Sequence, residues 1–295
     1  MKINNYSGWI FIDKPEGKTS FDVIRLIKKN LKVKKIGHSG TLDPIATGIL
    51  GIGIGEATKS IPFFSKRKEY KFNITFGESR DTDDIAGKTI MTVDLIPTTE
   101  EISKCLNVFK GKISQVPPKY SAVKVNGRRA YKLARNNINF QLHEKTIEIY
   151  HLECTGQVSQ STFSFVADCS SGTYIRSLAR DIAAKLNTLG YISYLRRTKL
   201  GKITEKDIIL VDKFNELVHI GDHFDLMHSI QDVLDDIQAV RLDKEFSHKF
   251  QNGLTFDYCN NKVFLKPLAI FSEKKLLGIA EINKGKLKPI RVFNI

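Results

Sequence analysis

Asp43 is the residue around which a chemical site could form, because the sequence presents its carboxylate on a constrained loop. It lies in the segment 37–48, Gly-His-Ser-Gly-Thr-Leu-Asp-Pro-Ile-Ala-Thr-Gly, with His38 five positions upstream. Pro44 disfavours helical backbone at the residue before it, so the aspartate stands on a turn rather than on a helix face. A carboxylate held in this way suits nucleophilic or proton-transfer chemistry. An Asp-Pro between glycines is also typical of a turn without chemical function.

The glycines that follow this loop raise a second hypothesis, a nucleotide-binding site, which the pattern does not support. Residues 51–56 read Gly-Ile-Gly-Ile-Gly-Glu and lack the third glycine of the dinucleotide fingerprint. No Gly-Lys-Ser or Gly-Lys-Thr sequence closes a phosphate-binding loop. The segment is therefore predicted to be a buried strand with close backbone neighbours.

The balance of charges points to a polyanionic partner. The chain has 295 residues, with 46 Lys and Arg against 32 Asp and Glu, which gives a formal net charge of +14. Such an excess indicates nucleic acid or an anionic membrane surface as the partner. No apolar run approaches the ~20 residues of a membrane span, and residues 1–6 contain no apolar signal core. We therefore expect a cytoplasmic protein that binds nucleic acid and not a membrane.

The cysteines do not indicate a metal site. No two of them stand at Cys-x-x-Cys spacing, which argues against zinc, and a chain of this size without a secretion signal argues against a disulfide framework. We expect them to be small buried hydrophobic residues. They are Cys105, Cys154, Cys169 and Cys259.

A strand and a helix are expected to lead into the Asp43 loop. Residues 9–12 are apolar and predict a short buried strand. Thr19 and Asp22 have the spacing of a capping box, which predicts a helix beginning at this point. The apolar stripe of this helix is expected to consist of Phe21, Ile24, Ile27 and Leu31.

The rest of the chain contains both strand and helix patterns before its character changes near residue 237. Alternating polarity predicts strands at 70–76, 145–152 and 162–167, and a short helix is expected at 57–64. A second capping box, Thr98 with Glu101, starts another helix. A further helix near 176–186 has Leu178, Ile182 and Leu186 facing inward. Beyond 237, short apolar runs separated by turns at 252–253, 260–261 and 284–285 predict a small β domain with little helix.

The Asp43 loop, together with further motifs in the same order, resembles the TruB family of tRNA pseudouridine synthases. The resemblance covers nearly all of the first ~200 residues and, less closely, the tail. One motif departs from the pattern, because the family has Thr-Asp-Thr-x-Asp where this chain has Arg80 at the first place. The matching motifs are Lys14-Pro15, Tyr70, Asp81-Thr82 with Asp84, the segment 117–127, Gly-Thr-Tyr-Ile-Arg at 172–176 and Tyr-Leu-Arg-Arg-Thr at 194–198.

The resemblance implies an α+β fold. Its catalytic core would be a mixed, mainly antiparallel central sheet flanked by helices, spanning residues 1–236. An insertion around 112–145 would grip RNA. Residues 237–295 would form a small β-barrel-like domain of the PUA type that binds RNA, although a β subdomain that merely covers the core would give the same pattern.

The resemblance also assigns roles to the motif residues. Asp43 would be the catalytic carboxylate, Arg176 would pair with it, and Tyr70 would stack on the target base. A surface salt bridge for Arg176 and a core position for Tyr70 are the plainer interpretations of the same residues. The remaining residues expected to bind or surround the substrate are Lys14, His38, Tyr174 and Leu195.

The implied reaction converts uridine to pseudouridine in the T-loop of tRNA, at position 55. The uracil is detached at N1 from C1′ of its ribose, turned and reattached through C5, so the reaction needs neither a cofactor nor a metal ion. The carboxylate of Asp43 would attack C1′ or remove the 2′ hydrogen. We expect the T-arm of tRNA as the partner, no obligate protein partner and a monomeric enzyme.

Two alternative functions remain open at this stage. One is modification of ribosomal RNA directed by a guide RNA, which occurs in the same superfamily, usually in proteins with longer termini. The other is an RNA-binding or RNA-folding protein in which catalysis is dispensable. The simultaneous presence of Asp43, Tyr70 and Arg176 favours catalysis.

Overall fold

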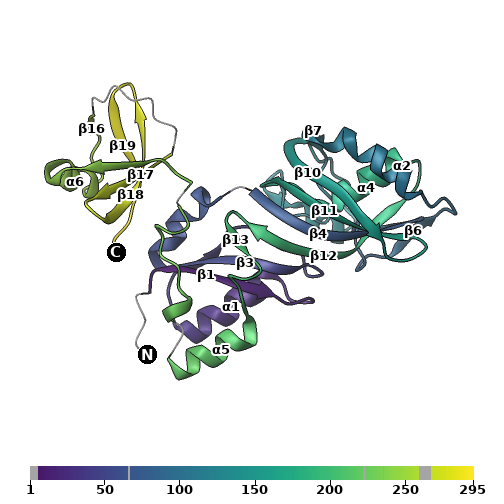
Figure 1. Cartoon of the computed structure of the whole chain (residues 1–295), viewed down its shortest axis with the longest axis horizontal. Coiled ribbons are helices and arrows are strands. Elements are labelled where there is room, and N and C mark those ends of the chain that lie inside the picture. The colour runs from purple at the N-terminus through teal and green to yellow at the C-terminus, as the bar shows by residue number, and fades with distance from the viewer. Residues whose placement is uncertain (1–5, 66, 222–223, 235, 259–266) are drawn as a thin grey trace.

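The chain folds into a large mixed sheet accompanied by helices, with a second, smaller sheet near its C-terminus (Figure 1). The architecture is that of a computed structural model, which describes residues 6–65, 67–221, 224–234, 236–258 and 267–295. Cys259, residues 1–5 and the turn predicted at 260–261 lie outside the described residues. The α+β fold class is as predicted.

Within the described residues, ten strands form the large sheet. They are β1 (Gly8–Lys14), β2 (Ile36–His38), β3 (Thr47–Ile54), β4 (Arg67–Phe76), β7 (Gly111–Gln115), β10 (Lys145–Gln157), β11 (Thr162–Ser170), β12 (Gly190–Leu200), β13 (Ile203–Thr204) and β14 (Ile209–Leu210). The main order is β14-β1-β3-β12-β4-β11-β10-β7, with β2 beside β3 and β13 beside β12. The β1–β14 and β3–β12 pairs are parallel and the others are antiparallel, so the prediction of a mixed, mainly antiparallel sheet is confirmed.

The described helices and two small ribbons complete this part of the chain. The helices are α1 (Ser20–Leu31), α2 (Thr99–Cys105), α3 (Ala130–Arg135), α4 (Ile175–Lys185) and α5 (Val211–Ile220), with 3-10 turns η1 (Gly55–Phe63), η2 (Leu106–Phe109) and η3 (Phe224–Leu226). The short helix predicted at 57–64 is thus the 3-10 turn η1. The ribbons pair β5 (Glu78–Arg80) with β6 (Thr89–Thr92), and β8 (Lys124–Val125) with β9 (Arg128–Arg129).

Helix α1 begins as the sequence predicts but buries a different stripe. The Thr19 hydroxyl accepts a hydrogen bond from the Asp22 amide at 3.0 Å, and the Asp22 carboxylate accepts one from the Thr19 amide at 3.1 Å. This reciprocal pair satisfies two backbone donors that the helix itself leaves free. Phe21 was expected to face the core, but it is 62% exposed and lies beneath the guanidinium of Arg25. Val23, rather than Phe21, belongs to the buried side of the helix.

Strand β1 shows how the two faces of the large sheet are covered. Successive side chains of a strand point to opposite faces. Ile10 and Ile12 join a core that contains residues of α1, α2, α4 and α5. Trp9 and Phe11 join a second cluster that includes residues of the C-terminal sheet. Because both faces are buried, β1 is apolar at consecutive positions, which is the signal by which it was predicted.

The C-terminal part contains the expected small β domain and one helix that was not expected. Its strands are β15 (Ala239–Leu242), β16 (Phe256–Asp257), β17 (Leu268–Ser272), β18 (Lys275–Asn283) and β19 (Lys286–Val292), in the order β15-β17-β18-β19-β16. The curled five-stranded sheet agrees with the predicted PUA-like fold. Helix α6 (Lys244–Gln251) was missed, although Asp243 caps it by accepting a hydrogen bond from the Phe246 amide at 3.0 Å. Its buried residues are Ser247 and Phe250, too few for a clear apolar stripe.

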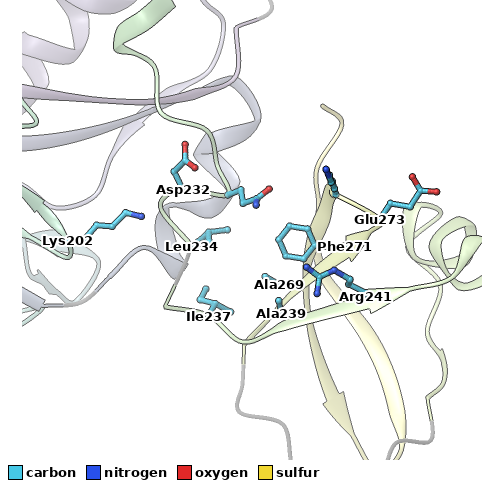
Figure 2. Close-up of a pocket in the computed structure, with 11 residues that line it drawn as sticks. Lys202, Asp232, Leu234, Ile237, Ala239, Arg241, Ala269, Phe271 and Glu273 are labelled. Carbon is cyan, nitrogen blue, oxygen red and sulfur yellow. The ribbon is translucent and has the colours of Figure 1, made fainter.

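The C-terminal sheet packs against the face of the large sheet that carries Trp9 and Phe11. A cavity of about 510 Å³ lies beside this contact. The Lys59 ammonium donates to the Val292 carbonyl at 2.8 Å, and the Asn294 amide donates to Glu56 at 2.8 Å. Figure 2 shows Lys202 and Leu234 on one side of the cavity, with Phe271 and other residues of the C-terminal sheet on the other. Asp43 does not line this cavity, so the cavity lies apart from the candidate site.

None of the helices in the described part of the chain combines the length and the apolar composition needed to cross a membrane.

Candidate active site

The structure brings Asp43 and Arg176 into direct contact, although they are 133 positions apart in the sequence. Asp43 lies in the loop between β2 and β3, and Arg176 lies in the first turn of α4. The arginine Nε donates to Oδ2 of the aspartate at 2.9 Å, and Nη2 donates to Oδ1 at 3.0 Å. Such a two-pronged pair fixes the carboxylate in position and orientation.

Arg176 also connects two other segments to the Asp43 loop. Its Nη1 donates to the Thr82 carbonyl at 2.9 Å, and its Nη2 donates to the Tyr120 carbonyl at 3.1 Å. The carboxylate of Asp84 lies 3.6 Å from Nη1. The Arg176 side chain is 4% exposed and that of Asp43 is 32% exposed. The arginine is therefore a buried junction, while the carboxylate it holds remains open to a substrate.

Contacts beneath the loop explain why Asp43 stays in this position. The hydroxyl of Ser20, at the start of α1, accepts from the Leu42 amide at 2.8 Å and donates to the Leu42 carbonyl at 3.1 Å. On the other side of Asp43, the Pro44 carbonyl accepts from the Gly17 amide at 2.9 Å. Both neighbours of the aspartate are thus tied to the segment that leads into α1.

Lys14 is buried under the same loop. Its ammonium donates to the carbonyls of Pro15 at 2.8 Å, Lys18 at 2.6 Å and Pro44 at 3.3 Å. Burial lowers the pKa of Lys14 to about 8, and the charge of Asp43 opposes this change. Lys14 is fully buried and therefore supports the loop from below.

Gly48 closes the loop at a position where a side chain does not fit. Its φ is +94°, and a Cβ built there would lie 2.2 Å from the Arg197 carbonyl oxygen of β12. Its amide donates to Asp13 at 3.1 Å, and Asp13 is held by Arg196. The close approach allows β3 and β12 to pair in parallel at this point.

We expect Gly48→Ala to lower the free energy of unfolding by about 3 kcal/mol or more, because it combines backbone strain with a steric clash. Urea unfolding monitored by circular dichroism measures the change. Gly111→Ala is the matched control, since Gly111 has a φ of +84° but no atom within 4 Å of the built Cβ. It should cost only about 1–2 kcal/mol. Equal losses for the two variants would show that the contact with Arg197 does not matter.

Tyr70 and Leu195 lie on one face of the sheet beside the loop. Tyr70 of β4 is opposite Arg197 of β12, and Leu195 is opposite Phe72. Residues two apart on paired strands share a face, so these four side chains are neighbours. Tyr70 and Leu195 are 7% and 4% exposed and belong to the same core as Leu42 of the loop. Burial raises the pKa of the Tyr70 hydroxyl, and Arg197 opposes the change.

His38 and Tyr174 border the loop from two further elements. The Nδ1 atom of His38 accepts from the Gly40 amide at 3.2 Å, and burial lowers the pKa of its ring. Tyr174 precedes α4, and its backbone exchanges hydrogen bonds of 2.8 and 3.1 Å with the Gln115 side chain. Burial raises the pKa of the Tyr174 hydroxyl, and the nearby charge of Asp43 acts in the same direction. The residues named from the sequence therefore surround one loop.

Three buried charged residues of this region lie in segments noted from the sequence but were not among the predicted site residues. Asp84, part of a motif that matches the family, faces Arg176 and is 5% exposed; its pKa is raised by burial. Lys68 and Arg197 are 7% and 0% exposed. A signal for Lys68 was available, because it falls on the buried positions of the alternation in β4. No such signal distinguishes Arg197, because its neighbour Arg196 is also an arginine.

The fold and the buried Arg–Asp pair define the class of protein expected from the motifs, a pseudouridine synthase. Residues 28–175 match the family model described as "TruB family pseudouridylate synthase (N terminal domain)". The chain is 40% identical to tRNA pseudouridine synthase B of Bradyrhizobium diazoefficiens, over 98% of this chain and 86% of that protein. It is also 40% identical to tRNA pseudouridine synthase B of Rickettsia bellii, over 99% of both. The chain belongs to the TruB family of pseudouridylate synthases.

Solved structures share the fold at lower identity. A chain of a crystal structure of a Cbf5-Nop10-Gar1 complex is 23% identical, with a TM-score of 0.72 over 97% of this chain and 84% of that chain. A chain of an H/ACA RNP bound to a substrate RNA containing 2′-deoxyuridine is 21% identical, with a TM-score of 0.71 over 98% of this chain and 85% of that one. Because the matches cover nearly the whole chain, they support the fold of both the large sheet and the C-terminal sheet.

Proposed function

We propose that this enzyme isomerises uridine to pseudouridine in tRNA, at position 55 of the T-loop, without a cofactor. The observation that carries the proposal is the contact between both oxygens of Asp43 and the buried guanidinium of Arg176. It places a charged, oriented carboxylate on a supported loop. Family membership and the two relatives named tRNA pseudouridine synthase B support tRNA as the substrate.

The carboxylate of Asp43 acts at the sugar of the target nucleotide. When the bond between C1′ and N1 breaks, its electron pair goes to N1 and positive character builds at C1′. Asp43 meets this change either by bonding to C1′ or by taking the hydrogen at C2′. Stabilising a sugar cation by a nearby carboxylate is the general chemistry of glycosidic bond cleavage. The uracil turns and C5 bonds to C1′, which breaks the bond to Asp43 in the first route or is accompanied by return of the hydrogen to C2′ in the second. The proton on C5 is lost and N1 gains one, so the product is an isomer.

The target base has to leave its stack before it can reach the carboxylate. Tyr70 compensates for part of this cost by stacking on the uracil, an interaction worth about 1–3 kcal/mol per base in other proteins. Leu195, on the same face of the sheet, contacts the other side of the base. His38 and Tyr174 hold the loop and the substrate from either side, and Lys14 supports the loop from below.

The T-arm is held by two surfaces outside the loop. The segment 112–145 carries exposed cations on β8, β9 and α3 and serves as the gripping insertion of a catalytic domain spanning 1–236. Residues 237–295 form a PUA-like domain that extends the RNA surface. The enzyme works in the cytoplasm as a monomer, without an obligate protein partner. The exposed cations of the insertion are Lys112, Lys119, Lys124, Arg128, Arg129, Lys132, Arg135 and Lys145.

An unmodified tRNA transcript tests the proposal. We expect incubation with the purified enzyme alone to give pseudouridine at position 55, mapped by chemical labelling and reverse transcription. A transcript with cytidine at that position is the control and should give no product. Product at other sites only, or only after addition of a guide RNA, would contradict the proposed specificity. Tight binding without product would show that RNA binding or folding is the function.

A further inference from the structure

Two buried cations beside the Asp43 loop have no carboxylate partner among the residues that the structure describes. Arg197 is fully buried and Lys68 is 7% exposed. Other arginines of the region are paired, Arg176 with Asp43 and Arg196 with Asp13 and Glu205. Burying a charge without a partner is costly, so such groups are rare unless a ligand or a reaction uses them.

The cationic groups of Lys68 and Arg197 lie close to the same residue of the loop, Gly40. Arg197 donates from Nε to the Ile49 carbonyl at 2.6 Å and from Nη2 to the Gly40 carbonyl at 3.2 Å, while Nη1 has no hydrogen-bond partner in the described part of the chain. The Lys68 ammonium donates to the Ser171 hydroxyl at 3.3 Å. A Cβ built on Gly40 would lie 3.0 Å from Lys68 Nζ and 3.6 Å from Arg197 Nη1. Both cationic groups therefore approach the same point of the loop.

The titratable neighbours of this pair supply no negative charge at neutral pH. Burial raises the pKa of the Cys169 thiol to about 11, so it stays protonated. Burial also raises the pKa of the Tyr70 hydroxyl, and it lowers that of His38, on which both cations act in the same direction. The carboxylate of Asp43 is already paired with Arg176. The two positive charges remain uncompensated in the free protein.

The position of the pair relates it to the proposed reaction. Arg197 is directly opposite Tyr70 in the pairing of β12 with β4, and Lys68 lies two residues before Tyr70 on the same buried face. In the proposed function, the uracil stacks on Tyr70. Cleavage of the bond to C1′ sends an electron pair to N1 and leaves the detached uracil negatively charged. Fixed positive charge near such a developing anion lowers the barrier without any reorganisation.

We propose that Lys68 and Arg197 are positioning residues that stabilise the detached uracil anion through the Tyr70 side of the site. This inference rests on the proposed function. Burial lowers the pKa of Lys68 to about 8, so its ammonium is still mainly protonated at neutral pH. Both groups act as cations, and their charge acts across the tyrosine without bonding to the substrate. The stabilisation is greatest while the bond to C1′ is broken and disappears when C5 has bonded to C1′ and N1 is protonated.

Single-turnover rates and dissociation constants, measured separately with the same tRNA, test the proposal. We expect Lys68→Gln to lower the rate of the chemical step by about 10²-fold, the effect of losing one electrostatic contact in other enzymes, with the dissociation constant unchanged. Lys68→Arg, which keeps the charge, should restore most of the rate. Arg67→Gln is the matched control, because Arg67 is exposed and paired with Asp168. Its rate should equal that of the parent.

A better leaving group distinguishes stabilisation of the anion from a structural role. Fluorine at C5 of the target uridine withdraws electrons and lets the ring carry negative charge more easily. Because C5 then has no proton to lose, the measured step on this substrate is cleavage of the bond between C1′ and N1 rather than formation of pseudouridine. The rate defect of Lys68→Gln should therefore shrink several-fold on this substrate, and likewise that of Arg197→Gln if the variant folds. An unchanged defect on both substrates would overturn the proposal in favour of a structural role.

Two further outcomes have distinct meanings. Weaker binding with an intact saturated rate, and a salt dependence reduced by about one charge, would overturn the proposal by making Lys68 a contact to an RNA phosphate. Failure of the parent enzyme to form pseudouridine would overturn the proposed function itself. Lys68→Gln is expected to disturb the fold less than Arg197→Gln and is therefore the better variant for this test. Lys68 makes one long hydrogen bond and is 7% exposed, whereas Arg197 is fully buried.

Discussion

Asp43→Asn is expected to reduce the single-turnover rate of pseudouridine formation by about 10⁴-fold or more, as removal of a central catalytic group does in other enzymes. The amide has nearly the same shape as the carboxylate, but it can neither bond to C1′ as an anion nor accept the hydrogen from C2′. The dissociation constant for tRNA should change by less than about threefold, since base stacking and phosphate contacts remain. Rapid-quench kinetics and filter binding measure the two quantities.

Asp83→Asn is the matched control for this experiment. Asp83 is also a partly buried carboxylate paired with an arginine of α4, Arg180, at 3.1 Å, one turn beyond Arg176. It does not touch Asp43, so its loss should change the rate by less than about tenfold. If Asp43→Asn retained a rate close to that of the parent, the carboxylate would have no chemical role. Equal losses of rate in the two variants would show that breaking either ion pair to α4 is enough, and that the carboxylate of Asp43 has no special role.

Local signals in the sequence predict elements better than they predict the order of the sheet. The capping boxes at Thr19 and Thr98 are both present, and the alternation at 70–76 marks part of β4. These patterns depend on neighbours within a few residues, which the sequence displays directly. The parallel pairing of β3 with β12 depends on the close approach of Gly48 to Arg197, 149 positions away. No local pattern encodes that contact.

The candidate site shows the same division between local and long-range information. The loop around Asp43 and the arginine of α4 were found from motifs, and the structure brings them together. Which of two adjacent arginines is buried depends on the pleat of β12, because Arg196 turns to Asp13 while Arg197 turns to Gly40. The burial of Asp84 could not be predicted, because a carboxylate in a turn is usually solvated, whereas here a helix from another part of the chain covers it.

The buried carboxylate of Asp84 makes Arg176 a structural as well as a chemical residue. Arg176→Gln is expected to reduce the rate by at least about 10²-fold, because Asp43 loses both of its hydrogen bonds and its orientation. It should also lower the free energy of unfolding by about 3 kcal/mol, a typical cost of removing one partner of a buried pair. Arg176→Lys keeps the charge, but a single ammonium cannot replace four hydrogen bonds. Compared with Arg176→Gln, it should therefore restore more of the free energy of unfolding than of the reaction rate.

The pH dependence of stability separates the two effects of Arg176. Burial raises the pKa of Asp84 in the folded state, and Arg176 opposes this rise. An acid whose folded pKa is raised stabilises the fold most below its unfolded pKa, and this contribution is lost as pH rises through the folded pKa. Without the arginine the pKa of Asp84 rises further, so the stability gap between parent and Arg176→Gln should narrow as the solution is acidified. Urea unfolding at a series of pH values measures the gap.

The double variant Arg176→Gln with Asp84→Asn completes the argument. Removing the stranded carboxylate should recover much of the lost stability at neutral pH, because a neutral amide at position 84 costs less to bury than an unpaired charge. The rate should stay low, since nothing then orients Asp43. If stability and rate recovered together, Arg176 would serve only to neutralise Asp84. If neither recovered, Asp84 would not be the group that Arg176 compensates.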